Sequence, residues 1–395
     1  MEALAYVVLF LTYLGLGLGY LPGYRTNRAG IAVTGAAFLL ALGVLDLKGA
    51  WEALDPHTLV FLFGVMVVNA HLGYAGFFQW AVDRLVHLAR TPFGLLVWLS
   101  FGTGVLSALF LNDTMAILLT PLVLFLTSSL SLPPVPYLLA LAGATNLGSV
   151  ATLTGNPQNI LVGSFSGISY LDFTAVLFPV ALLGLAVQVV LLWWLYPEVR
   201  SRRPLPPLPS LRYRLHRGLL FKGLWVTGGL FLAFILGYPL AQGALVAAGI
   251  LLFSRRLRSE RFFLRVDWEL LVMFSGLFMV TRAVGELGLL EPLKPLAHSP
   301  LGLIWVTALL SNLISNVPAV LLLHPLVGDT QSWLLLAAAS TLAGNLTLLG
   351  SVANLIVAEA ARREGYKLSF LEHLRFGLPL TLLTLGLAYV WLVLG

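Results

Sequence analysis

The chain has 395 residues, of which 59% are hydrophobic and only 10% are charged, and its mean hydropathy is +0.93. Soluble domains carry about 25% charged residues, so this composition excludes a soluble protein and predicts a polytopic membrane protein that contacts the lipid bilayer. The absence of cysteine excludes disulfides, thiolate metal sites and cysteine nucleophiles. The net charge of +6 reflects the distribution of basic loops, and we expect no nucleic-acid partner.

The apolar segments predict the membrane spans. About 20 helical residues cross an apolar core of ~30 Å. We expect spans near 3–22, 30–47, 58–78, 135–164, 172–196, 219–237, 239–254, 268–285, 332–361 and 373–394. The first is expected to be a retained helix and not a signal peptide, because no basic segment precedes it. Two further stretches, 93–127 and 300–327, carry polar residues in their middle.

The polar interruptions of the first half recur in the second. Ser107–Pro121 matches Ser311–Pro325 at an offset of 204, Gly155–Asn159 matches Gly350–Asn354 at 195, and Asp55 matches Asp267 at 212. Duplicated hydrophobic halves with matching polar or Gly/Pro interruptions are typical of inverted-repeat secondary transporters.

We therefore expect an all-α polytopic membrane protein of two inverted repeats. Residues 1–197 would supply five transmembrane helices with a re-entrant hairpin at 93–127 and an interrupted helix at 135–164. Residues 219–395 would supply the same elements, with the hairpin at 300–327 and the interrupted helix at 332–361. Residues 198–218, rich in proline and arginine, would join the repeats.

Basic residues predict the orientation. With each broken stretch taken as a hairpin, or as two spans, 20 of the 23 basic residues fall on one side, and only Lys48, Arg282 and Lys294 fall on the other. If each broken stretch crossed the membrane only once, the basic residues would no longer gather on one side. Cytoplasmic loops carry the excess of Lys and Arg, so we expect the linker in the cytoplasm and both termini outside it, in the inner (plasma) membrane.

Four breaks in helical structure are expected at membrane depth. Two are the hairpin tips, Asn112–Thr114 and Ser315–Pro318, and two interrupt helices at Thr154–Pro157 and Leu349–Ser351. Irregular backbone at this depth persists only when it is buried in protein or lines a wet cavity, and helix ends direct partial charges into such a cavity. The alternative is that these residues only cap and kink packed helices, but four breaks at matching positions favour a binding site.

Asp113 lies at a hairpin tip, midway through an apolar run, whereas the other 16 acidic residues fall at predicted helix ends, loops or outer turns. An ionisable group at this depth indicates a functional site. Desolvation would favour its protonated form, which suits a proton carrier, and a bound cation would favour the carboxylate. The alternative is a cap for the helix that follows. Thr145, Asn146, Thr341 and Asn345 are secondary candidates, since small polar residues also join membrane helices.

These motifs resemble the ion transporter superfamily, which includes arsenite permeases, silicic acid efflux transporters, sodium/proton antiporters of the same fold and divalent-anion symporters. The resemblance covers nearly the whole chain. It implies that substrate and coupling ions bind at the hairpin tips and helix breaks, here Asn112, Asp113, Thr114, Gly155, Asn156, Asn159, Asn316, Gly350, Ser351 and Asn354. It also implies that a homodimer is the expected assembly.

The tip sequences favour one branch of this superfamily. Divalent-anion symporters typically carry Ser-Asn-Thr at both tips, whereas this chain has Asn-Asp-Thr and Ser-Asn-Val, and the Asn-Asp pair looks more like the arsenite permease and silicic acid branch. No Lys or Arg is predicted at the site, which fits a neutral or weakly charged solute.

The resulting prediction is a transporter and not an enzyme, with no cofactor. It would export a small inorganic oxyacid (arsenite, antimonite or silicic acid) by alternating access, with H⁺ as the coupling ion carried by Asp113. The alternative is a sodium-coupled anion (dicarboxylate- or sulfate-like) symporter or a sodium/proton antiporter on the same fold. Na⁺ would then bind at Asn112 and Asn316.

Overall fold

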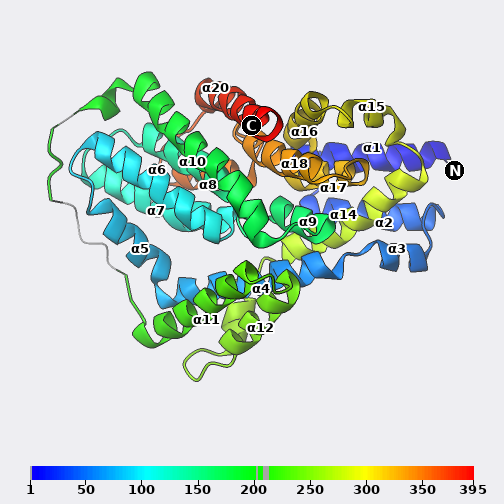
Figure 1. The fold of residues 1–395 in the computed structure, drawn as a ribbon, viewed down its shortest axis with the longest axis horizontal. Helices are drawn as coiled ribbons and strands as arrows, with labels where there is room; N and C mark the ends of the chain where they lie inside the picture. Colours follow the sequence, from blue (N-terminus) through cyan, green and yellow to red (C-terminus); the bar gives the residue numbers. More distant parts are fainter. Residues whose placement is uncertain (1, 202, 208–212) are drawn as a thin grey trace.

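The computed structural model describes residues 2–201, 203–207 and 213–395, and its regular elements in these ranges are all helices (Figure 1). The predicted all-α architecture is therefore confirmed. Residues 202 and 208–212, part of the predicted linker 198–218, lie outside the described residues.

The helices follow one another with short connections. The first half contains α1 (Glu2–Leu18), α2 (Arg28–Ala41), α3 (Leu47–Ala53), α4 (Pro56–Ala75), α5 (Phe77–Val86), α6 (Pro92–Leu109), α7 (Asn112–Ser129), α8 (Pro134–Ser149), α9 (Pro157–Ser166) and α10 (Tyr170–Leu195). The second contains α11 (Arg217–Ile235), α12 (Leu240–Leu252), α13 (Ser259–Phe263), α14 (Trp268–Glu286), α15 (Lys294–Ala297), α16 (Pro300–Ile314), α17 (Asn316–Leu323), α18 (Thr330–Ala343), α19 (Val352–Arg363) and α20 (Phe370–Tyr389).

Matching helices in the two halves begin with the same chemistry. Asp55 caps α4 by accepting from the Thr58 N–H at 3.0 Å, and Asp267 caps α14 by accepting from the Leu270 N–H at 2.9 Å. A side-chain oxygen at this position satisfies one of the free N–H groups of the first turn. Both bonds lie at the same offset of 212 in sequence, so the repeat extends to individual caps.

Within the halves, α6 packs on α8 as α16 packs on α18. Packing between the halves is reciprocal as well: α4 packs on α12 as α14 packs on α2 (Figure 1), and α7 packs on α19 as α17 packs on α9. Each half thus completes the other. This exchange supports the sequence repeat, while the inverted orientation of the two repeats stays a prediction.

Glycine permits two of these crossings. A Cβ at Gly64 of α4 would lie 2.6 Å from the carbonyl carbon of Ala244, and a Cβ at Gly276 of α14 would lie 2.7 Å from that of Ala32. Both distances are shorter than a Cβ can tolerate, so only glycine fits at either crossing. Small residues that bring backbones together are a common means of packing membrane helices.

Seven of the described helices are long and apolar enough to cross a membrane, and α1, α2, α12, α16 and α17 are shorter apolar helices. Large apolar side chains such as Phe10, Trp225 and Leu309 remain exposed on the outer surface, at 66%, 67% and 61%. In a soluble protein such exposure would be a liability, whereas here it faces lipid. The chain is a multi-pass membrane protein. The short helices α3, α5, α13 and α15 were not predicted, because they lie in connections that lack a spanning length of apolar residues.

The glycine crossings give a stability prediction. Replacing Gly276 by Val should destabilise the fold by about 1–3 kcal/mol, because the added side chain must displace the α2 backbone at Ala32. Thermal unfolding of the detergent-purified protein should show the lower midpoint. Gly228→Val on α11 is the matched control, since no atom lies within 4 Å of its added Cβ. Equal midpoints for the two variants would contradict the close crossing.

Candidate functional site

A polar cavity of about 220 Å³ lies where six helices begin, among them α7, α9, α17 and α19. Helices α7 and α17 begin at the two predicted hairpin tips, and α9 and α19 begin after the two helix breaks. We call this space the central cavity; its lining comprises Arg28, Asn112, Asp113, Pro157, Gln158, Asp267, Glu269, Leu270, Met273, Ser315, Asn316, Val317, Ser351 and Val352. Helix N-termini present free N–H groups and a partial positive charge, so the cavity is prepared for oxygen-rich solutes.

Each helix break is held open by one asparagine. Asn159 Nδ2 donates to the carbonyls of Ser149 and Thr152, both at 2.9 Å. Asn354 Nδ2 donates to the carbonyls that lie ten and seven residues before it, at 2.8 and 3.1 Å, just as Asn159 does. Carbonyls freed at the end of a helix need partners when no water is near. These two amides supply them at equivalent positions in both halves.

The break amides fix the orientation of further asparagines. Because Asn354 Nδ2 faces backbone carbonyls, its Oδ1 is left to accept from Asn146 Nδ2 at 3.2 Å. Asn146 Nδ2 also donates to Asn345 Oδ1 at 2.8 Å. Asn146 Oδ1 is then the acceptor, from Ser351 Oγ at 3.0 Å and from Asn112 Nδ2 at 3.4 Å. A single amide from the first half thus joins the second break to the first tip.

Asn112 ends this chain of amides with a free acceptor. Its Nδ2 is directed to Asn146, so its Oδ1 faces away and has no donor within the described part of the chain. The residue is only 4% exposed and its backbone N–H donates to the Gly155 carbonyl at 2.9 Å, which fixes its place. Buried acceptors are nearly always paired, so the free oxygen indicates a ligand that donates a hydrogen bond.

The second tip has a strained backbone. Ser315 adopts φ +80° and ψ 158°, a conformation that costs a non-glycine residue free energy. It lets α17 begin at Asn316, whose amide reaches the carbonyls of Ser340 and Gly350 at 3.1 and 3.2 Å in the orientation that satisfies both of its ends. Strain of this kind gathers at binding sites because the surrounding structure holds it in place.

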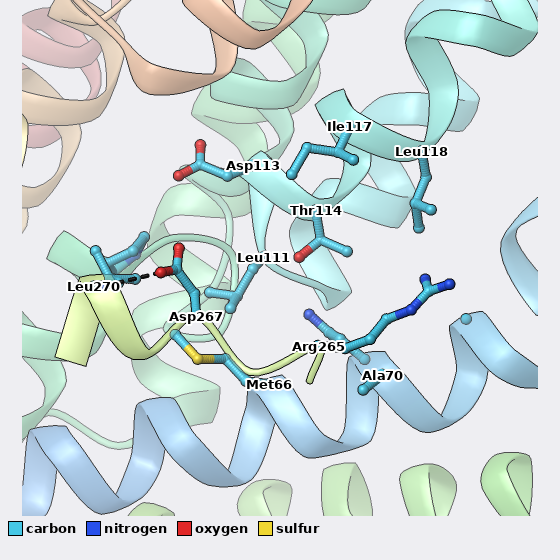
Figure 2. Close-up of a pocket in the computed structure, with 13 residues that line it drawn as sticks. Met66, Ala70, Leu111, Asp113, Thr114, Ile117, Leu118, Arg265, Asp267 and Leu270 are labelled. Carbon is cyan, nitrogen blue, oxygen red and sulfur yellow. Dashed lines mark hydrogen bonds between the residues drawn. The ribbon is translucent and has the colours of Figure 1, made fainter. Parts of the chain in front are cut away.

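Asp113 lies in the first turn of α7 and does not cap it. The cap position is Leu111, which makes no side-chain bond, and the Asp113 carboxylate accepts no hydrogen bond from the described residues. It lines both the central cavity and an adjoining cavity of about 160 Å³. Figure 2 shows Asp113 and Thr114 on one wall of this second space, with Asp267 and Arg265 on the segment that leads into α14.

Two predictions about charge at the site are wrong. Arg28 lines the central cavity, because Asn27 caps α2 and places Arg28 in its first turn; its Nε donates to the Leu16 carbonyl at 3.0 Å. Asp113 is not the only acid there either. Asp267 and Glu269 begin α14 at the same cavity. The sequence analysis placed the starts of α2 and α14 in outer turns, whereas both helices begin at the central cavity.

The structure distributes the predicted ligands over two layers. Asn112, Asp113, Asn316 and Ser351 line the central cavity, Thr114 lines the adjoining one, and Gly155, Asn156, Asn159, Gly350 and Asn354 belong to the breaks behind them. Thr145, Asn146, Thr341 and Asn345 are fully buried in the same second layer.

Gln158 was missed by the sequence analysis. It lines the central cavity while its Nε2 donates to Thr341 Oγ1 at 3.2 Å. Its signal was its place directly after Asn156-Pro157, in the first turn of a helix that starts at a break. Its match in the second half is Ala353, so the repeat gave no indication of it.

This architecture is that of a multi-pass membrane transporter. The chain belongs to the CitMHS family, described as citrate transporter, whose model matches residues 8–343. It is 32% identical to the silicon efflux transporter LSI3 of Oryza sativa subsp. japonica, over 97% of this chain and 95% of that protein. It is 30% identical to the inner membrane protein YbiR of Escherichia coli K12, over 87% of this chain and 90% of YbiR.

A solved structure shares the fold. The chain matches MtrF of Neisseria gonorrhoeae with a TM-score of 0.62 and 13% identity, over 99% of this chain and 94% of MtrF. At this identity the match concerns the fold alone. The family and these relatives together point to a membrane transporter and away from an enzyme. The resemblance to the ion transporter superfamily is confirmed.

Asn146 gives a prediction at this site. Asn146→Asp keeps the shape but removes the two donated bonds, so the Asn112 acceptor should lose its fixed position. The apparent affinity for substrate should fall about tenfold or more, the effect of one or more unsatisfied buried groups. Substrate-dependent transport rates in proteoliposomes measure it. Ser340→Ala is the control, since the Ser340 hydroxyl bonds only within its own helix, to the Ala337 carbonyl. Unchanged affinity for Asn146→Asp would contradict the role of the amide chain.

Proposed function

We propose that this protein is a secondary transporter that exports a small inorganic oxyacid, such as silicic or arsenous acid, in exchange for protons. The observation that carries the proposal is the set of acceptors at the first tip: the unpaired Asn112 Oδ1 and the Asp113 carboxylate, on two neighbouring residues that line the central cavity. An undissociated oxyacid presents O–H donors on every side, and such a solute can satisfy acceptors that the protein leaves free.

The charge of the cavity supports a neutral solute. A volume of about 220 Å³ admits a small oxyacid together with water. Three acids and one arginine face it, so an anion would meet a negative surround. The relative LSI3 is named as a silicon efflux transporter, which favours the same class of solute.

Asp113 is the proposed proton carrier. It lies at the tip of α7, lines the substrate cavity and accepts no hydrogen bond from the described residues. In this mechanism one proton and one oxyacid bind in turn at the first tip. Between these events the site changes its exposure from one side of the membrane to the other. The Arg-rich loops would lie in the cytoplasm of a cell bounded by its inner membrane, so the state described here would open its Asp113 side to the cytoplasm.

Arg28 and the family description favour a second candidate, a sodium-coupled anion symporter. An arginine in the central cavity can pair with a carboxylate substrate, and the family model is described as citrate transporter. In that case Na⁺ would be held at Asn112 and Asn316. The two candidates differ in the driving ion and in the charge of the solute.

Solute uptake separates them. Purified protein in proteoliposomes should accumulate arsenite and silicic acid under an imposed pH gradient with no sodium present. A gradient of about one pH unit supports about tenfold accumulation for each proton exchanged. Protein-free liposomes give the background. Accumulation of citrate that requires a sodium gradient, without oxyacid flux, would overturn the proposal in favour of the anion symporter.

Asp113→Asn tests the proton role separately. The amide preserves size and polarity but carries no titratable proton, so accumulation driven by the pH gradient should disappear while exchange of labelled solute at equal concentrations continues. Glu291→Gln is the control, because Glu291 is an exposed acid paired with Lys294 at 2.6 Å. Gradient-driven accumulation that survives in Asp113→Asn would assign the proton to another group.

A further inference from the structure

Two cavities at matching positions flank the site, but only one reaches it. The first, beside Asp113, is lined by Met66, Asn69, Gly73 and Ile117 among others. The second, of about 470 Å³, is lined by Phe278, Thr281, Gly285 and Leu321, their matches at offsets of 212 and 204. We call these the Asp113 cavity and the Phe165 cavity, after a residue in the wall of each.

Their connections differ. The Asp113 cavity shares Asp113, Pro157, Asp267 and Leu270 with the central cavity, so the two adjoin. Among the described residues, the Phe165 cavity shares none of its lining with the central cavity. The central cavity therefore extends toward one side of the molecule, the open side, and does not extend toward the other.

A hydrogen bond joins two parts of the fold beside the Phe165 cavity. Ser164 Oγ on α9 donates to Asp55 Oδ2 at 2.6 Å, and Asp55 belongs to the start of α4. Beside it, the Phe165 ring stacks on His324 with 4.4 Å between ring centroids. Helix α4 packs on α9 here, whereas the matching helices α14 and α19 make no extended contact in the described chain.

The matching residues on the open side do not meet. Asp55 corresponds to Asp267, and Ser164 corresponds to Glu359. Asp267 accepts a hydrogen bond from the Leu270 N–H, as in the other half, and Glu359 pairs with Arg362 at 3.0 Å. Two ionised carboxylates cannot form the bond that a hydroxyl and a carboxylate form. The contact beside the Phe165 cavity therefore has no chemical equivalent on the open side.

We propose that the Asp55–Ser164 hydrogen bond is a one-sided latch: it holds the Phe165 cavity closed from the central cavity and biases the transporter toward the state with the Asp113 cavity open. The inference rests on the alternating access of the proposed function. The bond joins two half-buried residues, and because only one side has it, the two end states are unequal in free energy before any solute binds.

Cysteine chemistry can test the latch, because the chain contains no cysteine. Val352→Cys, in the lining of the central cavity, supplies a single reporter thiol. A membrane-impermeant maleimide, applied from one side or the other of oriented vesicles, should label it mainly from the side of the Asp113 cavity. Adding Ser164→Ala should raise the ratio of labelling from the Phe165-cavity side to labelling from the Asp113-cavity side about tenfold.

A matched variant and a cross-link complete the test. Ser166→Ala should leave the labelling ratio unchanged, because the Ser166 hydroxyl accepts only from the nearby Ile168 N–H, at 3.1 Å. Asp55→Cys with Ser164→Cys should form a disulfide that stops labelling from the Phe165 side until it is reduced, whereas Asp267→Cys with Glu359→Cys should not cross-link in the resting protein.

The readout requires no solute flux. A shift in labelling without oxyacid transport would support the latch and overturn the substrate assignment. An unchanged ratio in a folded Ser164→Ala protein, or labelling from the Asp113 side alone in every variant, would overturn the latch and leave the uptake results standing.

Discussion

The structure depends on one constraint: peptide groups freed where a helix stops inside an apolar region must find partners within the protein. Asn159 and Asn354 meet it by donating both amide protons to carbonyls of the interrupted stretch before them. With those carbonyls satisfied, α9 and α19 can begin anew at the centre of the molecule and turn their N-termini toward the central cavity. Without these amides there would be no break and hence no cavity between the tips.

The same constraint orients the binding site. An amide whose nitrogen faces backbone carbonyls can only offer its oxygen on the other side, and this polarity passes from Asn354 to Asn146 and on to Asn112. The free oxygen at the tip is thus a consequence of carbonyls freed at a break in the other half. Such networks specify geometry strongly because a half-satisfied member is costly in a low-dielectric interior. The charges come from elsewhere, since Arg28, Asp267 and Glu269 stand on α2 and α14.

Much of this arrangement follows from the sequence and some of it does not. The repeat offsets located both tips and both breaks, because polar residues and Gly or Pro are costly inside apolar runs and therefore mark the points where a helix stops. The positions of Arg28 and Asp267 were not predicted, because a capped helix start has the same sequence pattern at a membrane surface and at the centre of the molecule. Gln158 escaped because it has no match in the other half. The amide chain through Asn146 joins residues about 200 positions apart, and no local pattern encodes its direction.

A duplicated fold would supply two similar end states, so any preference of the empty protein for one of them must come from where the halves differ. The asparagine bonds that hold the two breaks are the same in both halves. Three of the matching positions whose side chains differ are Asp113 against Val317, Gln158 against Ala353, and Ser164 against Glu359. The first two differences place an acid and an amide on the first-half side of the binding site, where the second half has apolar side chains. The third would make the helix contacts beside the site unequal as well, because a hydroxyl and a carboxylate attract where two carboxylates repel. In this view the two repeats share the geometry that alternating access requires. The differences at Asp113, Gln158 and Ser164 then set which end state the empty transporter prefers and which solute it binds.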